Sequence, residues 1–516
     1  MKKSLRITFS LTLLVLTNSF GQSKFQNHIY TDGIETLNSV TQTSDSNFVL
    51  AGGTRNTSSS YGIFIAKINP NGDTLWTHSY SHDIGSQTSS VANSIVETSD
   101  HGFYVTGYTQ AFSLNFQFYI LRLDSLGDTL WTRTVQHPLG AENYGYSGIQ
   151  TKDGNFVSFG RQGYFQADFF LNKFDAAGSL LWSKSYDIQN QNDFGNSVNE
   201  TYDHGLIMGG SQNEIINQKI LILKADSVGN YLWGKCFYGG IADECNMIKQ
   251  TADSGFLIVG NTESFGAGSS DILVIKTNSQ GDTLWTKAYG TTGYEQCFAF
   301  SQTPDQGYIL TGQAPNPLTT SPGYLLMKID MNGNLEWSKV YRGGISLGNS
   351  KSVALTTDYG YLICGEGSFF IKVDEFGNSG CDENNVIMTA VPAPVSMVLL
   401  MPTLSVSVSV GSNPLNSHRG ADIINFCFDN GTESLKEESD WLVYPNPANE
   451  KMVIQLKENN STAQLLIYDM LGNKRFEMKL NNNSRCELNI ENWPLGVYSV
   501  LLKSEKGIFS KRIIHQ

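Results

Sequence analysis

The sequence predicts an all-β protein: a seven-bladed β-propeller closed by an N-terminal strand, followed by a small C-terminal β-sandwich. A short phrase, GDTLW in its commonest form, places tryptophans at Trp76, Trp131, Trp182, Trp233, Trp285 and Trp337. These are 55, 51, 51, 52 and 52 residues apart, a period that indicates a repeat architecture. The composition agrees, because only 16% of residues are charged and 50 are glycine.

Each repeat reads as four short strands at period two. In the fifth repeat, a turn at Asp253-Ser254-Gly255 precedes a strand that ends at Gly260. A long loop follows, then a strand whose last basic residue is Lys276, then an Asp-x-x-Gly or Asn-x-x-Gly turn and the Leu-Trp strand. Four antiparallel strands in about fifty residues are typical of a propeller blade. No apolar period of 3.6 residues is present, so a helical solenoid is excluded.

The number of blades follows from counting these marks. There are seven Asp turns (Asp45, Asp100, Asp153, Asp203, Asp253, Asp305, Asp358) and seven basic strand ends (Lys67, Arg122, Lys173, Lys224, Lys276, Lys328, Lys372). Only six Leu-Trp strands are present. Tyr30 ends an N-terminal strand and precedes Asp45 by 15 residues, while Tyr289 precedes Asp305 by 16. We therefore expect the segment around Phe25 to supply the missing strand of the seventh blade and to remove an exposed sheet edge.

The regular residues have structural explanations. We expect the tryptophans to fill the space between neighbouring blades, and the seven basic residues either to pair with the turn aspartates or to be solvated. The Asp-x-x-Gly turns lack the alternating oxygen ligands and closing glutamate of a calcium loop. The sequence thus predicts no metal and no cofactor.

Both ends of the chain differ from the repeats. Residues 1–21 have a basic start, a short apolar run and a small-residue cleavage site, which predict a signal peptide. The propeller is expected over residues 22–380, and residues 381–440 are expected to be an uncharged β segment followed by an acidic linker. Cys381 and Cys427 bracket the uncharged run and are predicted to form a disulfide. Its prolines favour strands, so we expect no transmembrane helix in the mature protein.

Residues 441–516 have lost the fifty-residue period and contain short alternating strands. Their motifs are Tyr444-Pro445-Asn446-Pro447, a turn at Gly472, the Gly496-Val497-Tyr498 strand and a basic end at Lys511. This stretch resembles the type A C-terminal sorting domain of type IX secretion substrates. The resemblance implies that the secretion machinery binds residues 441–516, and that the cargo passes through the periplasm and is released or attached to the outer surface.

Long loops on one end of the propeller are the expected place for a ligand. They carry aromatic residues that suit a carbohydrate or a peptide, and our candidates are Tyr61, Phe112, Phe116, Tyr144, Phe165, Phe194 and Phe265. The alternative is that these rings pack their own loops.

The function expected from these features is that of an exported, non-catalytic propeller that binds a carbohydrate or a protein at the cell surface. The net charge of -13 argues against a nucleic-acid partner. No catalytic motif is found. Two alternatives stay open: a hydrolase or lyase acting on glycans with Glu142, Asp193 or Glu263, and a structural adhesin or spacer.

Overall fold

The structure is a computed structural model of the chain, and it forms two compact units, Met1–Gly431 and Thr432–Gln516. It describes residues 23–30, 34–55, 61–81, 89–113, 115–136, 141–163, 167–213, 217–317, 322–341, 348–380, 383–405, 408–412, 416–419, 422–429, 441–444, 451–456, 463–469, 474–480, 485–494, 496–504 and 507–515. The predicted signal peptide lies outside these ranges. Within them, no helix is long and apolar enough to cross a membrane.

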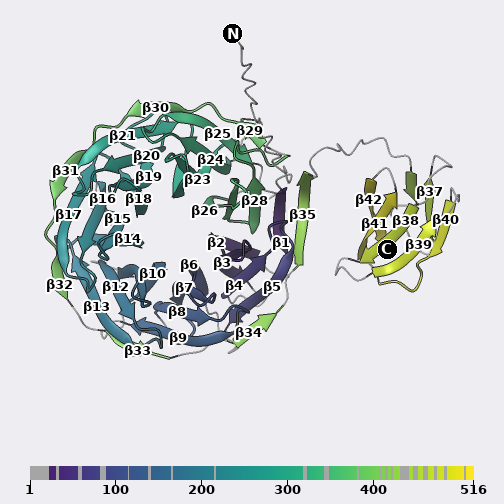
Figure 1. Ribbon diagram of the computed structural model, residues 1–516, viewed down its shortest axis with the longest axis horizontal. Coiled ribbons are helices and arrows are strands. Elements are labelled where there is room, and N and C mark those ends of the chain that lie inside the picture. The colour runs from purple at the N-terminus through teal and green to yellow at the C-terminus, as the bar shows by residue number, and fades with distance from the viewer. Residues whose placement is uncertain are drawn as a thin grey trace, which may run out of the picture. The chain divides into compact units, whose positions relative to one another are not determined.

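The first unit is a ring of seven antiparallel sheets, which confirms the predicted seven-bladed propeller (Figure 1). From the innermost strand outward, blade 1 contains β2 (Ile34–Gln42), β3 (Phe48–Arg55), β4 (Tyr61–Ile68) and β5 (Thr74–Ser81). Blade 2 contains β6 (Ser90–Glu97), β7 (Phe103–Thr109), β8 (Gln117–Leu123) and β9 (Thr129–Gln136). Blade 3 contains β10 (Asn143–Gln150), β11 (Phe156–Gln162), β12 (Asp168–Phe174) and β13 (Leu180–Asp187). Blade 4 contains β14 (Asn192–Glu200), β15 (Leu206–Asn213), β16 (Gln218–Ala225) and β17 (Tyr231–Tyr238). Blade 5 contains β18 (Asp243–Gln250), β19 (Phe256–Thr262), β20 (Asp271–Thr277) and β21 (Thr283–Gly290). Blade 6 contains β22 (Gln296–Gln302), β23 (Tyr308–Pro315), β24 (Pro322–Ile329) and β25 (Leu335–Tyr341).

Blade 7 joins the two ends of the repeat region, as predicted. It contains β26 (Ser350–Leu355), β27 (Tyr361–Gly365), β28 (Phe369–Val373) and the N-terminal strand β1 (Lys24–Tyr30). Phe25 lies opposite Lys372, just as Trp76 lies opposite Lys67 in blade 1. Phe25 therefore occupies the tryptophan position of the seventh blade.

A fifth strand on every blade comes from residues 383–429, which we call the girdle. Its strands are β29 (Glu383–Asn385), β30 (Thr389–Pro392), β31 (Ser396–Leu399), β32 (Thr403–Ser405), β33 (Ser409–Gly411), β34 (Asn416–Arg419) and β35 (Asp422–Asp429). They pair in turn with the outer strands of blades 6, 5, 4, 3, 2, 1 and 7, so the girdle runs back around the whole ring (Figure 1). Whereas we expected residues 381–440 to follow the propeller as a separate segment, residues 383–429 complete its sheets.

The girdle protects sheet edges that the repeats leave open. An outer strand exposes unpaired N–H and C=O groups that pair readily with another chain, and here each outer strand has an antiparallel partner. The last strand, β35, pairs with β1, so the closing strand lies between β28 and β35. The cysteine pair predicted to close this segment lies outside the described residues at Cys381, and the Cys427 side chain is likewise not described. That disulfide stays a prediction.

Side chains on the innermost strands link four of the blades to the next one. The innermost strands carry a β-bulge at the same place, for example between Ala92 and Ser94. In four blades the bulged residue is an asparagine whose side chain donates to a carbonyl of the following blade: Asn38 to Ala92, Asn93 to Gly145, Asn196 to Cys245 and Asn246 to Cys297, at 2.7–2.9 Å. The corresponding residues in blades 3, 6 and 7 are Tyr146, Phe298 and Lys351.

The tryptophans and basic residues behave as structural elements. A Cβ on Gly281 of blade 5 would lie 2.8 Å from the Trp233 ring of blade 4, so the turn glycine allows the tryptophan to fill the space between blades. Every basic strand end pairs with the aspartate of its own blade's turn at no more than 3.1 Å: Lys67–Asp45, Arg122–Asp100, Lys173–Asp153, Lys224–Asp203, Lys276–Asp253, Lys328–Asp305 and Lys372–Asp358. The salt-bridge alternative is therefore confirmed.

The second unit contains two sheets. One has the order β36 (Trp441–Tyr444), β37 (Lys451–Leu456), β40 (Arg485–Asn489), and the other β39 (Lys474–Leu480), β38 (Ala463–Asp469), β41 (Gly496–Ser504), β42 (Gly507–His515). Both sheets supply side chains to one buried cluster, which includes Ile454, Cys486, Leu465 and Val500.

Candidate functional site

Six partly exposed side chains of blades 2 to 4 gather at the end of the propeller that carries the long loops, and we call them the aromatic–arginine cluster. Its members are Tyr108 on β7, Phe116 before β8, Tyr144 and Tyr146 on β10, Arg161 on β11 and Phe194 on β14. They come from three neighbouring blades, and their strand ends bring them to the same end of the propeller.

Arg161 lies at the centre of this cluster. Its guanidinium carbon is 4.4 Å from the centroid of the Tyr144 ring and 4.7 Å from that of the Phe194 ring. Both distances are within the range of a cation–π interaction. Arg161 pairs with no carboxylate of the described residues, and its buried Nε has no hydrogen-bond partner there. The seven basic strand ends, by contrast, all pair with carboxylates, so Arg161 is set apart from them by having no carboxylate partner among the described residues.

The rings of Tyr108, Phe116, Tyr144 and Tyr146 also pack against one another. Tyr108, Phe116 and Tyr144 form a triangle with centroids 5.0–5.3 Å apart, and Tyr146 is stacked on Tyr144 at 6.3 Å. The Tyr144 hydroxyl donates to Oε2 of Glu142 at 2.8 Å. Burial and this carboxylate raise the pKa of Tyr144, so its hydroxyl is a neutral hydrogen-bond donor at ordinary pH.

Strand register explains why these residues meet. Tyr144 lies directly opposite Arg161 in the β10–β11 pair, so both side chains project from the same face. The β-bulge between Gly145 and Ser147 then presents Tyr146 on that face as well. Tyr146 takes the position at which four other blades have the linking asparagine.

The structure brings together three of the seven predicted ligand residues: Phe116, Tyr144 and Phe194. Phe112 instead packs beside Tyr119 on the core between blades 1 and 2. Phe265 packs on the core of blades 4 and 5. Tyr61 is 38% exposed at the start of β4, where its backbone forms an isolated bridge with Ser89. Phe165 lies outside the described residues.

Sequence reasoning missed Tyr108, Tyr146 and Arg161. Arg161 follows the glycine that ends the second strand, and the other blades have Gly53, Tyr108, Ser211, Asn261, Gln313 or Glu366 there. A basic residue at this position occurs only in blade 3, and Tyr146 likewise departs from the repeat. These departures from the repeat pattern were the feature of the sequence that could have identified Arg161 and Tyr146 as candidate ligand residues.

The carboxylates considered for catalysis do not form a surface pair. Asp193 has no exposed area and accepts hydrogen bonds from the Ile188 N–H and the Gln212 side chain, both at 2.9 Å. Glu142 accepts the hydrogen bond from the Tyr144 hydroxyl. Asp193 is instead close to Asp168 and Asp187, and one ligand atom from each of these three residues lies within 4.8 Å of the others. Among the described residues, these three carboxylates form the group whose oxygen atoms lie close enough together to hold a metal ion.

A hollow of about 540 Å³ lies at the opposite, short-turn end of blades 1 to 3. It contains Ser44, His101 and Glu97, the residue types of a nucleophilic triad. However, Ser44 Oγ at 2.9 Å and Glu97 Oε1 at 3.5 Å both contact Nδ1 of His101. A triad needs the acid and the nucleophile on different ring nitrogens, so this arrangement does not activate the serine.

Residues 442–516 match the family model of the secretion system C-terminal sorting domain. This part of the chain is such a sorting domain. It directs the protein to type IX export and to the cell surface or the medium. Within the sorting domain, the buried Tyr498 donates to the Pro494 carbonyl at 2.6 Å. Tyr444, Gly496 and Lys511 lie on β36, β41 and β42, while Pro445, Asn446, Pro447 and Gly472 lie outside the described residues.

No curated protein matches the chain. Among solved structures, the chain is similar to the WD40 β-propeller domain of Doa1, with 12% identity, 67% of this chain and 96% of that chain covered, and a TM-score of 0.42. It is also similar to streptogramin B lyase (10% identity, 70% and 98%, TM-score 0.44) and to Sqt1 from Chaetomium thermophilum (10% identity, 67% and 99%, TM-score 0.43). Likenesses of this size carry no conclusion about ligand or activity.

Proposed function

We propose that the exported propeller binds a carbohydrate through the aromatic–arginine cluster. The observation that carries this proposal is Arg161, which two rings hold in place while it pairs with no carboxylate of the described residues. Partly exposed rings can stack on the apolar face of a sugar, and guanidinium N–H groups suit its hydroxyl or carboxylate oxygens.

The position of Tyr146 supports the same proposal. An asparagine there would link blade 3 to blade 4, as Asn93 links blade 2 to blade 3 at 2.7 Å. Blade 3 gives up that hydrogen bond and has a partly exposed ring stacked on Tyr144 instead. Tyr146 therefore extends the ring surface at a position where four blades have a linking asparagine, which supports a ligand-binding role.

The experiment is glycan-array binding by the full chain, followed by titration calorimetry with the sugar that binds. We compare Tyr146→Asn, which adopts the residue of four other blades, with Phe298→Asn, which makes the same kind of change in blade 6, outside the cluster. A stacking contact contributes about 0.5–1.5 kcal/mol, so Tyr146→Asn should weaken binding about two- to tenfold. Phe298→Asn should leave it unchanged.

Three results would overturn the proposal. A folded chain that binds no glycan would leave a protein ligand or a spacer as the better explanation. Equal losses in both variants would show that the effect is structural. Release of a shortened sugar during the titration would favour the glycan-acting enzyme.

A further inference from the structure

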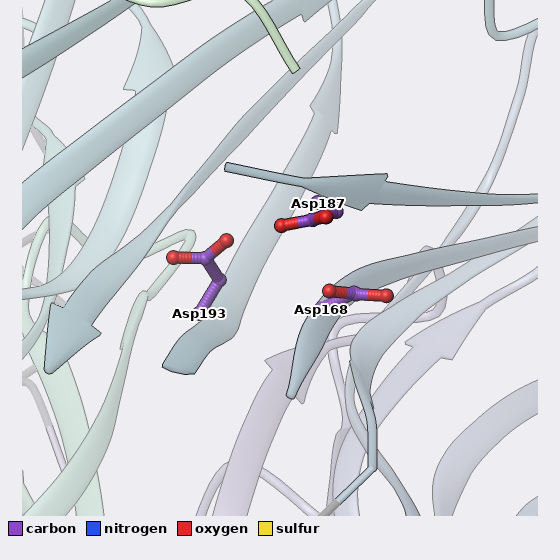
Figure 2. Close-up of side chains that lie close together, drawn as sticks. All are labelled: Asp168, Asp187 and Asp193. Atoms are coloured by element: carbon purple, nitrogen blue, oxygen red, sulfur yellow. The ribbon is translucent and has the colours of Figure 1, made fainter. Parts of the chain in front are cut away.

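Three carboxylates, Asp168, Asp187 and Asp193, converge where blades 3 and 4 meet (Figure 2). Asp168 begins β12, Asp187 ends β13 and Asp193 is the second residue of β14, so they come from blades 3 and 4. Asp168 and Asp187 are half-buried, and Asp193 is fully buried. The three side chains point toward a common space in the figure.

No positive side chain of the described residues pairs with this group. Asp168 accepts from Ser185 Oγ at 2.9 Å, Asp187 from the Asn190 N–H at 2.7 Å, and Asp193 from Ile188 and Gln212. These are neutral donors. Burial, with a smaller contribution from neighbouring carboxylates, raises the pKa of Asp193 to about 8 and that of Asp168 to about 6. The site therefore lacks the positive charge that its carboxylates need.

Gln162 gives an independent indication of a missing ligand. It is 7% exposed, and its side-chain nitrogen has no hydrogen-bond partner in the described part of the chain. Gln162 lies directly opposite Asp168 in the β11–β12 pair, so its side chain projects from the same face of the sheet as the Asp168 carboxylate. A buried amide left without partners is costly. Because the oxygen and nitrogen of an amide are assigned from their neighbours, a cation would turn the Gln162 oxygen inward.

Blade 2 has an uncharged pair at the same repeat positions, although Oε1 of Gln117 is buried there without a hydrogen-bond partner among the described residues. Gln117 and Gln136 stand there in place of Asp168 and Asp187, and the Gln117 amide donates to Oε1 of Gln136 at 2.9 Å. Blade 3 replaces this neutral, hydrogen-bonded pair by two like charges. That replacement makes sense where a positive ion is bound between them.

We propose that Asp168, Asp187 and Asp193, with Gln162 as a fourth ligand, bind a divalent cation of the calcium type. All four offer oxygen ligands, which hard cations such as Ca²⁺ prefer, and no thiol or imidazole is among them. The sequence predicts no metal here, since these four residues are far from a contiguous calcium-loop motif. This inference stands apart from the proposed function, although Gln162 and Asp193 adjoin Arg161 and Phe194 in the sequence.

The test is calorimetric titration of CaCl₂, and separately of MgCl₂, into the full chain after treatment with a chelator. We expect one saturable calcium site, accompanied by a rise in melting temperature. The double variant Asp168→Gln/Asp187→Gln gives blade 3 the amide pair of blade 2, so it should fold and lose the site. Asp124→Asn, which removes a carboxylate from an exposed turn elsewhere, should retain it.

Absence of saturable calcium binding in the wild-type chain would overturn the proposal, and would indicate that the carboxylates share a proton instead. Unchanged calcium binding in a folded double variant would overturn it as well, because the ion would then bind elsewhere. Glycan binding is measured separately, so its failure does not affect this result.

Discussion

The guanidinium carbon of Arg161 in blade 3 lies 4.7 Å from the ring centroid of Phe194 in blade 4. The same guanidinium carbon lies 4.4 Å from the ring centroid of Tyr144, which is in the same blade as Arg161. Arg161 thus connects two blades at the end of the propeller where the long loops meet, and it does so without an ion pair to any described residue.

Replacing Arg161 by lysine should separate the contribution of guanidinium stacking from the contribution of the positive charge. Lysine keeps the positive charge but lacks the planar group that stacks between rings. We expect Arg161→Lys to lower the free energy of unfolding by about 1 kcal/mol and to weaken glycan binding. Urea denaturation and calorimetry measure the two effects, and unchanged binding would show that the guanidinium does not contact the ligand.

Tyr146→Asn should affect binding more than stability. The new side chain can donate to the Gly195 carbonyl, as Asn93 donates to that of Gly145, and such a bond contributes about 1 kcal/mol. It replaces a ring stack of similar strength. We therefore expect the free energy of unfolding to change by less than about 1 kcal/mol, as measured by denaturation. A large loss of stability would mean that Tyr146 is a structural residue.

The turn aspartates predict loss of stability in acid. Partial burial would raise the pKa of Asp203, but hydrogen bonds from Thr201, Lys224 and the Gly205 N–H outweigh it and lower the pKa to about 2. An unfolded aspartate titrates near about 3.9, so the ionised carboxylate stabilises the fold above about pH 4, and this is lost as the pH falls toward 2. Denaturation midpoints at pH 6, 4 and 3 should fall less steeply in Asp203→Asn/Lys224→Met. Identical pH dependence of the wild-type and variant chains would contradict this.

The girdle predicts that the propeller does not end where its repeats end. A chain of residues 22–431 should be stable and monomeric. Ending the chain at 380 removes the partners of seven outer strands and exposes their edges, so it should melt at lower temperature and aggregate. Calorimetry and light scattering distinguish the two chains, and equal behaviour would show that the girdle adds no stability.

Cys381 and Cys427 are predicted to join the two ends of the girdle. Cys427 lies opposite Gln26 in the β1–β35 pair, and the Gln26 amide donates to Ser379 Oγ at 2.9 Å, two residues before Cys381. Mass spectrometry of peptides from the secreted, unreduced protein should find them linked, after loss of two electrons and two protons to a periplasmic thiol oxidant. Two free thiols in that protein would contradict the prediction. Cys381→Ser should lower the melting temperature only under oxidising conditions.

The sequence by itself determined the features that repeat. Trp233, Lys276 and Asp253 recur with their turns in successive blades, so local strand and turn preferences specified the blade, the number of blades and the closure by Phe25. The sorting domain was predictable for a similar reason, since Tyr444 to Pro447 and Gly496 belong to motifs of fixed order.

Only the tertiary structure decided what depends on contacts between distant segments. The girdle strands pair through backbone groups, so no periodic pattern of their side chains indicates which outer strand each of them pairs with. Arg161 and Phe194 meet because two blades pack at one register, and Asp168, Asp187 and Asp193 meet because three strand ends coincide. Such meetings are set by strand register and blade packing, which neither residue spacing nor composition specifies.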